Sequence, residues 1–152
     1  MLTVEHATDL KAYEGHELGH SGWVTITQRD IADFARLTGD DHWIHVDVER
    51  AATAMPGGKT IAHGLFVLSL IPALQRQIYQ IRQRGRGFNY GYDRIRFIAP
   101  IQEGSAVRLR QTLFAATSRD TGTRLEIDAV IEVEGASQPA IVARSILLIE
   151  NA

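Results

Sequence analysis

The spacing of hydrophobic residues changes along this chain, from helical spacing in its first half to alternation in its second half. Trp23 to Ile26 reads as a short strand, and Thr27 follows it as a candidate helix N-cap. Asp30 stands three residues later, where a capping box places its acidic partner. Apolar positions then recur at helical spacing as far as Gly39, and glycine commonly ends helices. The pattern predicts a strand followed by a capped helix.

Two further helices are predicted before the middle of the chain. A short one covers Val48 to Met55 and ends at Pro56-Gly57-Gly58. The longer one falls within Thr60 to Arg82, the most apolar stretch, which is hydrophobic on nearly all sides after Leu65. A helix of that kind belongs in a protein core. Pro72 lies in its second half and is expected to kink it or force a local adjustment.

From residue 88 onward, alternation of polar and apolar residues predicts four strands. Short turns between the later strands imply antiparallel pairing. The predicted strands are Phe88–Ile98, Val107–Ala115, Arg124–Glu134 and Ala140–Glu150. A sheet that curls around the apolar helix would bury both elements. We therefore expect an α+β architecture in a single domain over residues 1–152.

The composition excludes several classes of protein. The chain has 152 residues, of which 45% are hydrophobic, and this is enough for one sizeable core. Because it contains no cysteine, it has no disulfide, thiolate nucleophile or cysteine-based metal site. A net charge of −2 does not favour a nucleic acid partner. No stretch approaches the roughly 20 apolar residues of a membrane span, and the N-terminus does not resemble a signal peptide. We therefore expect a cytoplasmic protein that does not attach to membranes.

A polar segment after the first predicted helix carries the candidate chemistry. Asp40 to Asp47 contains three acids, two histidines and a tryptophan, and it fits neither helical nor strand spacing. Asp40 and His45 follow a helix-ending glycine and are five residues apart, which allows their side chains to converge. A carboxylate and an imidazole can hold one water between them and move protons to and from it. The alternative is a solvated acidic loop with an incidental histidine.

Three blocks of sequence resemble the MaoC-like family of R-specific enoyl-CoA hydratases, also called hydratase 2. The first runs from Phe34 to His45 and contains the family's Gly39-Asp40 step, and its Trp43-Ile44-His45 form resembles a subgroup that includes nodulation protein N-like dehydratases. The second is Ile61-Ala62-His63-Gly64-Leu65, and the third runs from Asn89 to Pro100. The order and spacing of these blocks agree with the family over roughly residues 20 to 110.

The resemblance implies the hot-dog fold, an antiparallel sheet wrapped around a long central helix, and the order of predicted elements leads independently to the same layout. It also implies a homodimer, a CoA or acyl-carrier thioester as substrate, and no metal or organic cofactor. By matching position, Asp40 and His45 take the acid–base roles. Some family members carry a serine where this chain has Pro72, so no chain-length preference follows.

Gly64 is the candidate for the oxyanion hole. Hydration of an enoyl thioester builds negative charge on the carbonyl oxygen, which a backbone N–H can stabilise. Glycine allows the carbonyl to approach the backbone closely. The alternative is a glycine needed only for a tight junction between loop and helix.

Other candidate residues each have a structural alternative. Trp43 could wall the site or anchor the loop in a core. His63 could line the site or form a structural hydrogen bond, and Asn89 could orient the loop or touch substrate. No HExxH pattern indicates a metal. A basic cluster could receive CoA phosphates or simply form a solvated helix end; it consists of Arg76, Arg82, Arg84 and Arg86.

The sequence therefore favours an (R)-specific enoyl-CoA hydratase, which is a 3-hydroxyacyl-CoA dehydratase in the reverse direction. Two alternatives stay open. An acyl-CoA thioesterase on the same fold would use Asp40 to activate water against the carbonyl. A non-catalytic acyl-thioester-binding subunit would not need the pair, and the retention of Asp40 and His45 counts against it.

Overall fold

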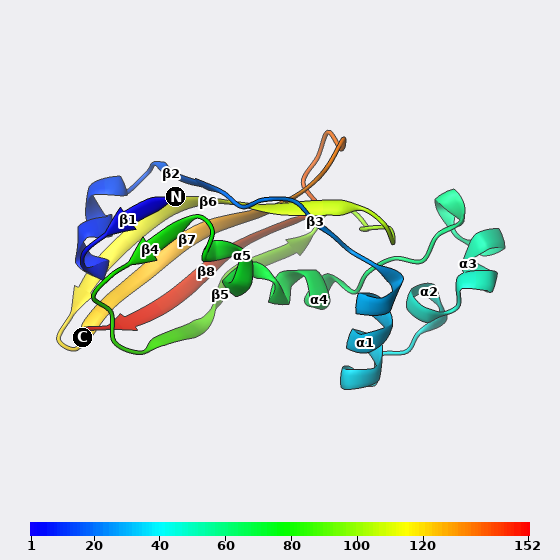
Figure 1. Ribbon diagram of the computed structural model, residues 1–152, viewed down its shortest axis with the longest axis horizontal. Coiled ribbons are helices and arrows are strands. Elements are labelled where there is room, and N and C mark those ends of the chain that lie inside the picture. The colour runs from blue at the N-terminus through cyan, green and yellow to red at the C-terminus, as the bar shows by residue number, and fades with distance from the viewer.

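The computed structural model describes residues 1–152, and its main feature is one curved antiparallel sheet (Figure 1). The strand order is β2-β6-β7-β8-β5, and β3 also pairs with β6. The four strands predicted after residue 88 are confirmed, and the strand predicted at residues 23–26 is present as β3. The strands of this sheet are β2 Glu17–His20, β3 Val24–Thr25, β5 Gly87–Phe97, β6 Ala106–Arg119, β7 Gly122–Val133 and β8 Ile141–Glu150.

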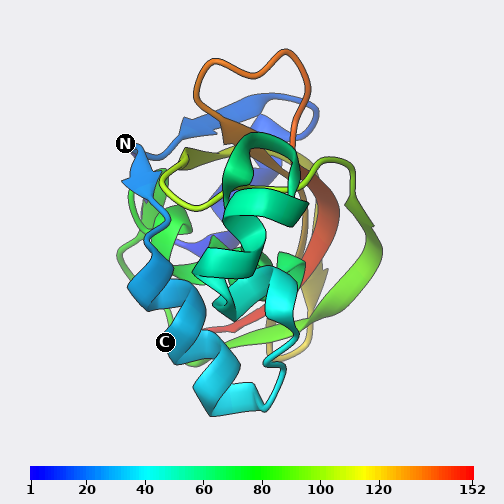
Figure 2. The ribbon, with the colours of Figure 1, turned by 90° about the vertical axis from the view of Figure 1, so that its right-hand side faces the viewer.

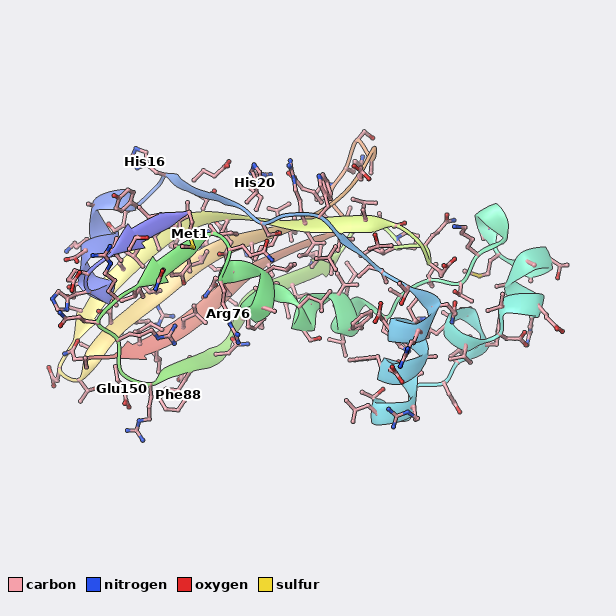
Figure 3. The ribbon with its side chains drawn as sticks, viewed as in Figure 1. Met1, His16, His20, Arg76, Phe88 and Glu150 are labelled. Atoms are coloured by element: carbon pink, nitrogen blue, oxygen red, sulfur yellow. The ribbon has the colours of Figure 1, made fainter.

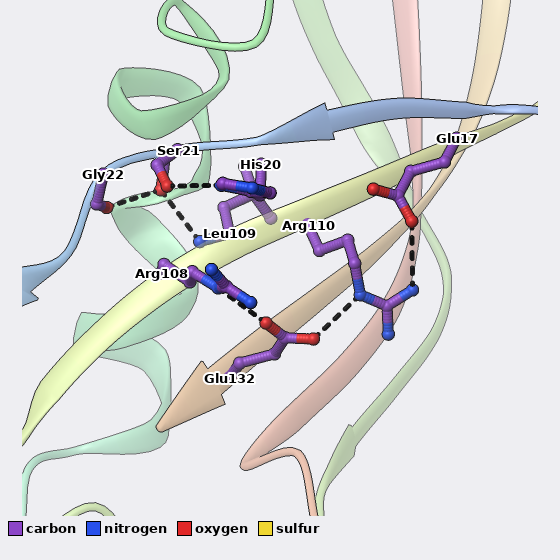
Figure 4. A network of polar contacts seen from close by, with 8 residues as sticks. All are labelled: Glu17, His20, Ser21, Gly22, Arg108, Leu109, Arg110 and Glu132. Atoms are coloured by element: carbon purple, nitrogen blue, oxygen red, sulfur yellow. Dashed lines mark hydrogen bonds and ion pairs between the residues drawn. The ribbon is translucent and has the colours of Figure 1, made fainter. Parts of the chain in front are cut away.

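Alternation along the long strands gives the sheet one apolar face and one polar face. In β6, Leu109 is buried in the core while its neighbours Arg108 and Arg110 lie partly exposed on the other face. Both arginines donate hydrogen bonds to Glu132 of β7, and Arg110 also pairs with Glu17 of β2 (Figure 4). The hydrogen bond from Arg110 is the main cause that lowers the pKa of Glu132. These contacts tie β2, β6 and β7 together on the side away from the core.

Two short helices, α4 (Gly64–Ser69) and α5 (Ile71–Gln75), pack against the apolar face of the sheet (Figures 1 and 2). The single helix predicted here is therefore interrupted. Pro72 has no N–H to continue the helical hydrogen bonds, and it stands within the first turn of α5, where none is needed. At the junction between the two helices, the N–H of Leu70 donates to the carbonyl of Val67, three residues earlier, at 3.1 Å. The buried side chains of the pair are Val67, Leu68, Ile71 and Leu74.

The prediction that helix could extend as far as Arg82 is wrong, because the helical segment ends before residue 79. Strand β4 (Tyr79–Ile81) follows α5 and pairs in parallel with β1 (Leu2–Val4). Between β1 and β2 a 3-10 helix, η1 (Ala7–Tyr13), buries Leu10 in the same core. No helix in the structure has both the length and the hydrophobicity that a transmembrane span requires.

The remaining helices gather beyond one end of the sheet (Figure 1, right; Figure 2, front). The helix predicted between Thr27 and Gly39 and the one predicted from Val48 are both confirmed. The segment between them, which fitted no periodicity, contains one turn of helix. These elements are α1 Gln28–Thr38, α2 Trp43–Val46, α3 Val48–Ala54 and the 3-10 turn η2 Pro56–Gly58.

Strand β5 forms an edge of the sheet and pairs only with β8. Two register shifts, between Asn89 and Gly91 and between Tyr92 and Arg94, interrupt the alternation predicted along it. Bulges of this kind are common at sheet edges. Most of the strand is exposed, including Tyr90 with 68% of its surface accessible.

Candidate active site

The segment that carries Asp40 begins where α1 ends, and both ends of α1 are formed as the sequence predicts. At its start, the Asp30 N–H donates to Thr27 Oγ1 at 3.2 Å, and the Thr27 N–H donates to Asp30 Oδ2 at 3.0 Å. Hydrogen bonds from Thr27 lower the pKa of Asp30. At its end, Gly39 has φ of 80°, a left-handed conformation that glycine adopts without strain. This turn reverses the chain and places Asp40 directly after it.

Asp40 and His45 line the same cleft, of about 360 Å³, which we call the first cleft. It lies between the start of α4 and the turn that follows β5. Asp40 is exposed, whereas His45 on α2 keeps only 8% of its surface accessible. Most of the wall is apolar, and includes Leu65, Phe97, Ile98, Pro100 and Ile141. The structure therefore brings the predicted pair together at one cleft beside apolar surface.

Backbone contacts fix the position and the tautomer of His45. Its Nδ1 lies 2.7 Å from the carbonyl oxygen of Ile61. A carbonyl can only accept, so Nδ1 carries the proton and Nε2 is left with a free lone pair. The carbonyl of His45 accepts a hydrogen bond from Gln28 Nε2 at 2.8 Å, and Gln28 Oε1 accepts one from Thr60. Ile61 thus orients the imidazole, and Gln28 holds the backbone of the same residue.

His63 links the two members of the pair. It is 4% exposed, and its ring stacks on that of His45 with centroids 3.7 Å apart and an interplanar angle of 24°. Its Nε2 donates to the backbone carbonyl of Asp40 at 2.8 Å. On its other side it contacts Phe34, at 5.0 Å between ring centroids. Its Nδ1 is buried without a hydrogen-bond partner. His63 thus contacts the ring of one residue and the backbone of the other.

The three polar groups are close enough together to raise the question of a metal. One ligand atom from each of Asp40, His45 and His63 lies within 4.8 Å of the other two. The two imidazoles are stacked, however, and the lone pairs of stacked rings run side by side rather than toward a common point. Metal ligands must point at one centre. The arrangement suits proton transfer better than metal coordination.

Burial and neighbouring groups set the protonation of His45. Burial is the largest influence and lowers the pKa of His45 below its ordinary value of 6.5. The hydrogen bond to Ile61 and the charge of Asp40 act in the opposite direction, whereas His63 and His42 lower the pKa further. The net effect keeps the imidazole neutral near pH 7, so its free nitrogen can accept a proton.

Gly64 stands at the junction where α4 begins, on the wall of the first cleft. As the first residue of a helix, it has an N–H without an intrahelical acceptor. A Cβ at this position would lie 2.5 Å from Cδ1 of Phe97. Glycine is therefore needed for the close approach of β5, and the N–H beside it remains available to a ligand.

Comparison with known proteins identifies the family. A model described as a MaoC like domain matches residues 9–134. The chain belongs to the MaoC-like dehydratase family. Among its curated relatives, 3-hydroxyacyl-thioester dehydratase Z of Mycobacterium tuberculosis is 46% identical over 148 residues, which cover 97% of each chain. Nodulation protein N of Rhizobium leguminosarum is 40% identical over 144 residues, 93% of this chain and 89% of its own.

Solved structures confirm the predicted hot-dog fold of this MaoC-like dehydratase. The R-hydratase PhaJ1 from Pseudomonas aeruginosa superposes with a TM-score of 0.74 at 19% identity, covering 91% of this chain and 83% of that one. The (R)-hydratase from A. caviae involved in PHA biosynthesis gives a TM-score of 0.68 at 23% identity, covering 88% and 97%. The sheet, the apolar helical segment and the helices at one end are thus those of a hot-dog fold.

Two of the predicted site residues do not line the first cleft of the dehydratase. Trp43 is half-buried on α2, with the guanidinium carbon of Arg50 4.1 Å from its ring centroid. Asn89 lies on β5 at a separate cleft of about 260 Å³, called the second cleft below.

Sequence reasoning missed Gln28, Thr60 and Phe97, which hold His45 or line the first cleft. Gln28 and Thr60 are polar residues near predicted loops and carried no motif. Phe97 reads as an ordinary strand residue, and only the fold brings it against Gly64.

Proposed function

We propose that this MaoC-like dehydratase catalyses the reversible, (R)-specific hydration of trans-2-enoyl thioesters of CoA or an acyl carrier. The observation that carries the proposal is the convergence of Asp40 and His45 at one apolar cleft. The names of the relatives, a 3-hydroxyacyl-thioester dehydratase and R-hydratases, support the same chemistry.

In the proposed reaction Asp40 and His45 hold one water between them. The water oxygen bonds to the β-carbon of the enoyl group while the pair removes its proton, and the pair supplies a proton to the α-carbon. The neutral Nε2 of His45 and the carboxylate of Asp40 are both suited to accept a hydrogen bond from that water. The sum of the two transfers is one water added across the double bond, and the enzyme ends in its starting protonation state.

Gly64 is proposed to stabilise the charge that develops on the thioester oxygen. As electrons shift from the double bond toward the carbonyl, the oxygen becomes enolate-like, and a preorganised N–H lowers the barrier. The N–H of Gly64 has no intrahelical partner and lies on the same cleft as the catalytic pair. A substrate whose double bond meets the pair would therefore direct its carbonyl toward this junction.

His63 is proposed as a positioning residue rather than a substrate contact. Its stack on His45 and its hydrogen bond to the Asp40 carbonyl hold the two catalytic residues at a fixed separation. Such preorganisation matters because small displacements of catalytic groups are costly to the rate.

A homodimer is proposed to form along β5. The strand has a free backbone edge, and an exposed edge of this length is a site for pairing with another chain. Large side chains stand exposed along it and directly after it, at Phe88, Tyr90, Phe97 and Ile98. Analytical ultracentrifugation of Tyr90→Lys should show a shift toward monomer, whereas Phe114→Lys, at a half-exposed aromatic on β6, should not.

Turnover of trans-2-enoyl-CoAs by purified variants tests the function. Asp40→Asn and His45→Gln should each lose most hydration activity while circular dichroism and sedimentation stay unchanged. Asp41→Asn and His42→Gln are matched controls, because these neighbours carry the same groups and do not line the cleft. Near-normal hydration of crotonyl-CoA by both catalytic variants would contradict the proposed roles.

The same assay separates the alternatives. Release of free thiol without formation of a 3-hydroxyacyl product would favour thioester hydrolysis. Activity of the purified chain alone would exclude a subunit that only binds acyl thioesters, and chiral analysis of the alcohol tests the (R) assignment.

A further inference from the structure

The four arginines of the basic cluster fall into two pairs with different surroundings. Arg82 lies 3.8 Å from a carboxylate oxygen of Glu5, and Arg86 pairs with Glu150 at 2.7 Å. Arg76 and Arg84 form no ion pair and no side-chain hydrogen bond in the structure, and both line the second cleft. In Figure 3, Arg76 extends from the end of α5 on the side where Phe88 lies near the start of β5. Only this second pair of arginines is therefore free to bind a ligand.

The second cleft is rich in hydrogen-bond donors and contains no carboxylate. Asn89 Nδ2 has a single long contact, 3.5 Å, to the hydroxyl of Tyr92. Gln75 uses its Oε1 to accept a hydrogen bond from the fully buried Gln111, at 2.9 Å, which leaves its amide N–H groups as donors. The floor is apolar and is formed by Ile71, Leu147 and Ile149. A donor-rich rim above an apolar floor fits an anionic group attached to a flexible or apolar chain.

Both clefts lie between the α4–α5 segment and strands β5 and β8. The first is bounded by Gly64 and Phe97, and the second by Arg76 and Asn89. If the residues between rise as in a helix, Gly64 and Arg76 are roughly 18 Å apart. A thioester with a long acyl chain or a pantetheine arm is comparable in length with this span.

We propose that the second cleft is an anion subsite in which Arg76 and Arg84 bind a phosphate or carboxylate at the far end of the thioester substrate. This inference rests on the proposed function, because it assigns the subsite to the substrate of the first cleft. Guanidinium groups bind phosphate and carboxylate oxygens in bidentate geometry, and the absence of a competing carboxylate leaves both groups available.

Kinetics with charged and neutral thioesters test the subsite. The double variant Arg76→Ala/Arg84→Ala is compared with Arg82→Ala/Arg86→Ala, which removes the same charge from the ion-paired arginines. If the anion is a carrier phosphate, the first double variant should raise the KM for crotonyl-CoA about tenfold or more, with kcat nearly unchanged. The KM for the crotonyl thioester of N-acetylcysteamine, which carries no phosphate, should not change in either variant.

A second pair of substrates identifies the source of the anion. Medium-chain 2-enoyl N-acetylcysteamine thioesters ending in a carboxylate or in a methyl group differ only at the acyl tail. A KM increase confined to crotonyl-CoA assigns the subsite to a carrier phosphate, and one confined to the carboxylate-tailed thioester assigns it to the acyl end. Equal changes for charged and neutral thioesters, or no change for any, would overturn the proposal.

Failure of the proposed function would look different. It would appear as a wild-type protein that hydrates none of these thioesters. In that case calorimetric titration with CoA alone still tests the carrier arm, and titration with a medium-chain dicarboxylate tests the acyl arm. Binding of either compound that is lost in Arg76→Ala/Arg84→Ala supports the subsite, and no binding of either contradicts it.

Discussion

Replacing His63 with phenylalanine separates the proposed positioning role from simple packing. A phenyl ring keeps the stack on His45, whose ring centroid lies 3.7 Å away, and the contact with Phe34 at 5.0 Å. The change removes the Nε2 hydrogen bond to the Asp40 carbonyl. It also removes the buried Nδ1, which has no partner.

The expected effect on stability is small because the two losses oppose one another. A neutral hydrogen bond contributes a net of about 0.5–1.5 kcal/mol, whereas an unpartnered buried polar atom costs about 1–3 kcal/mol. Removing both should leave the free energy of unfolding of His63→Phe within roughly 2.5 kcal/mol of the wild type. The effect on catalysis is larger, since Asp40 loses a backbone anchor and a displacement near 1 Å can cost about 100-fold in rate. We expect kcat to fall about 10- to 100-fold.

The pH profile of kcat/KM distinguishes this outcome from a general loss of structure. His63 lowers the pKa of His45, so its removal should raise that pKa and move the acid limb of the profile to higher pH. His63→Gln, which retains a donor for the Asp40 carbonyl, should recover part of kcat. A folded His63→Phe enzyme with unchanged kcat and an unshifted acid limb would refute the positioning role.

Three further predictions follow from the same contacts. Because burial lowers the pKa of His45, the unfolded state binds a proton below about pH 6.5 that the folded state does not. The free energy of unfolding should therefore fall as the pH drops below that value. Chemical denaturation at several pH values should show a shallower fall for His45→Gln than for the wild type. Gly64→Ala should raise KM by forcing the Phe97 ring into the first cleft, and the double variant with Phe97→Ala should recover it. Thr27→Ala should destabilise the protein by about 1 kcal/mol in thermal unfolding, whereas Thr27→Ser should retain the cap. Equal destabilisation by the two variants would contradict the capping role of the Thr27 hydroxyl.

The elements that could be predicted from the sequence are those whose signals are local. The cap at Thr27, the terminating Gly39 and the alternation of the later strands each depend on residues a few positions apart. The break in the central helix is only partly predictable, because Pro72 indicates a kink or an interruption but does not fix the residue at which the first helix ends. Strand β4 was missed because its partner is the N-terminal β1, and no local spacing encodes a parallel pairing.

The residues of the candidate site also differ in how far they could be predicted from the sequence. The convergence of Asp40 and His45 could be predicted because the two residues are five positions apart in one segment and their side-chain chemistry is complementary. Their supports could not, because Gln28 and the carbonyl of Ile61 reach His45 from 17 and 16 residues away. A backbone carbonyl leaves no trace in the sequence at all, since every residue has one.

The site is organised by one five-residue segment, Thr60–Gly64, which precedes α4. Thr60 donates a hydrogen bond to Gln28, and the carbonyl of Ile61 fixes the tautomer of His45. His63 donates to the carbonyl of Asp40, and Gly64 has an N–H without an intrahelical partner. The segment is itself held by the backbone bond from Ala62 to Ile101, at 2.8 Å. Because one short stretch of backbone positions Asp40, His45 and the Gly64 N–H together, a displacement of it would shift all three groups at once. Substitutions within this segment should therefore combine non-additively in kcat, whereas substitutions in the second cleft, which has no lining residue in the segment, should combine with them additively.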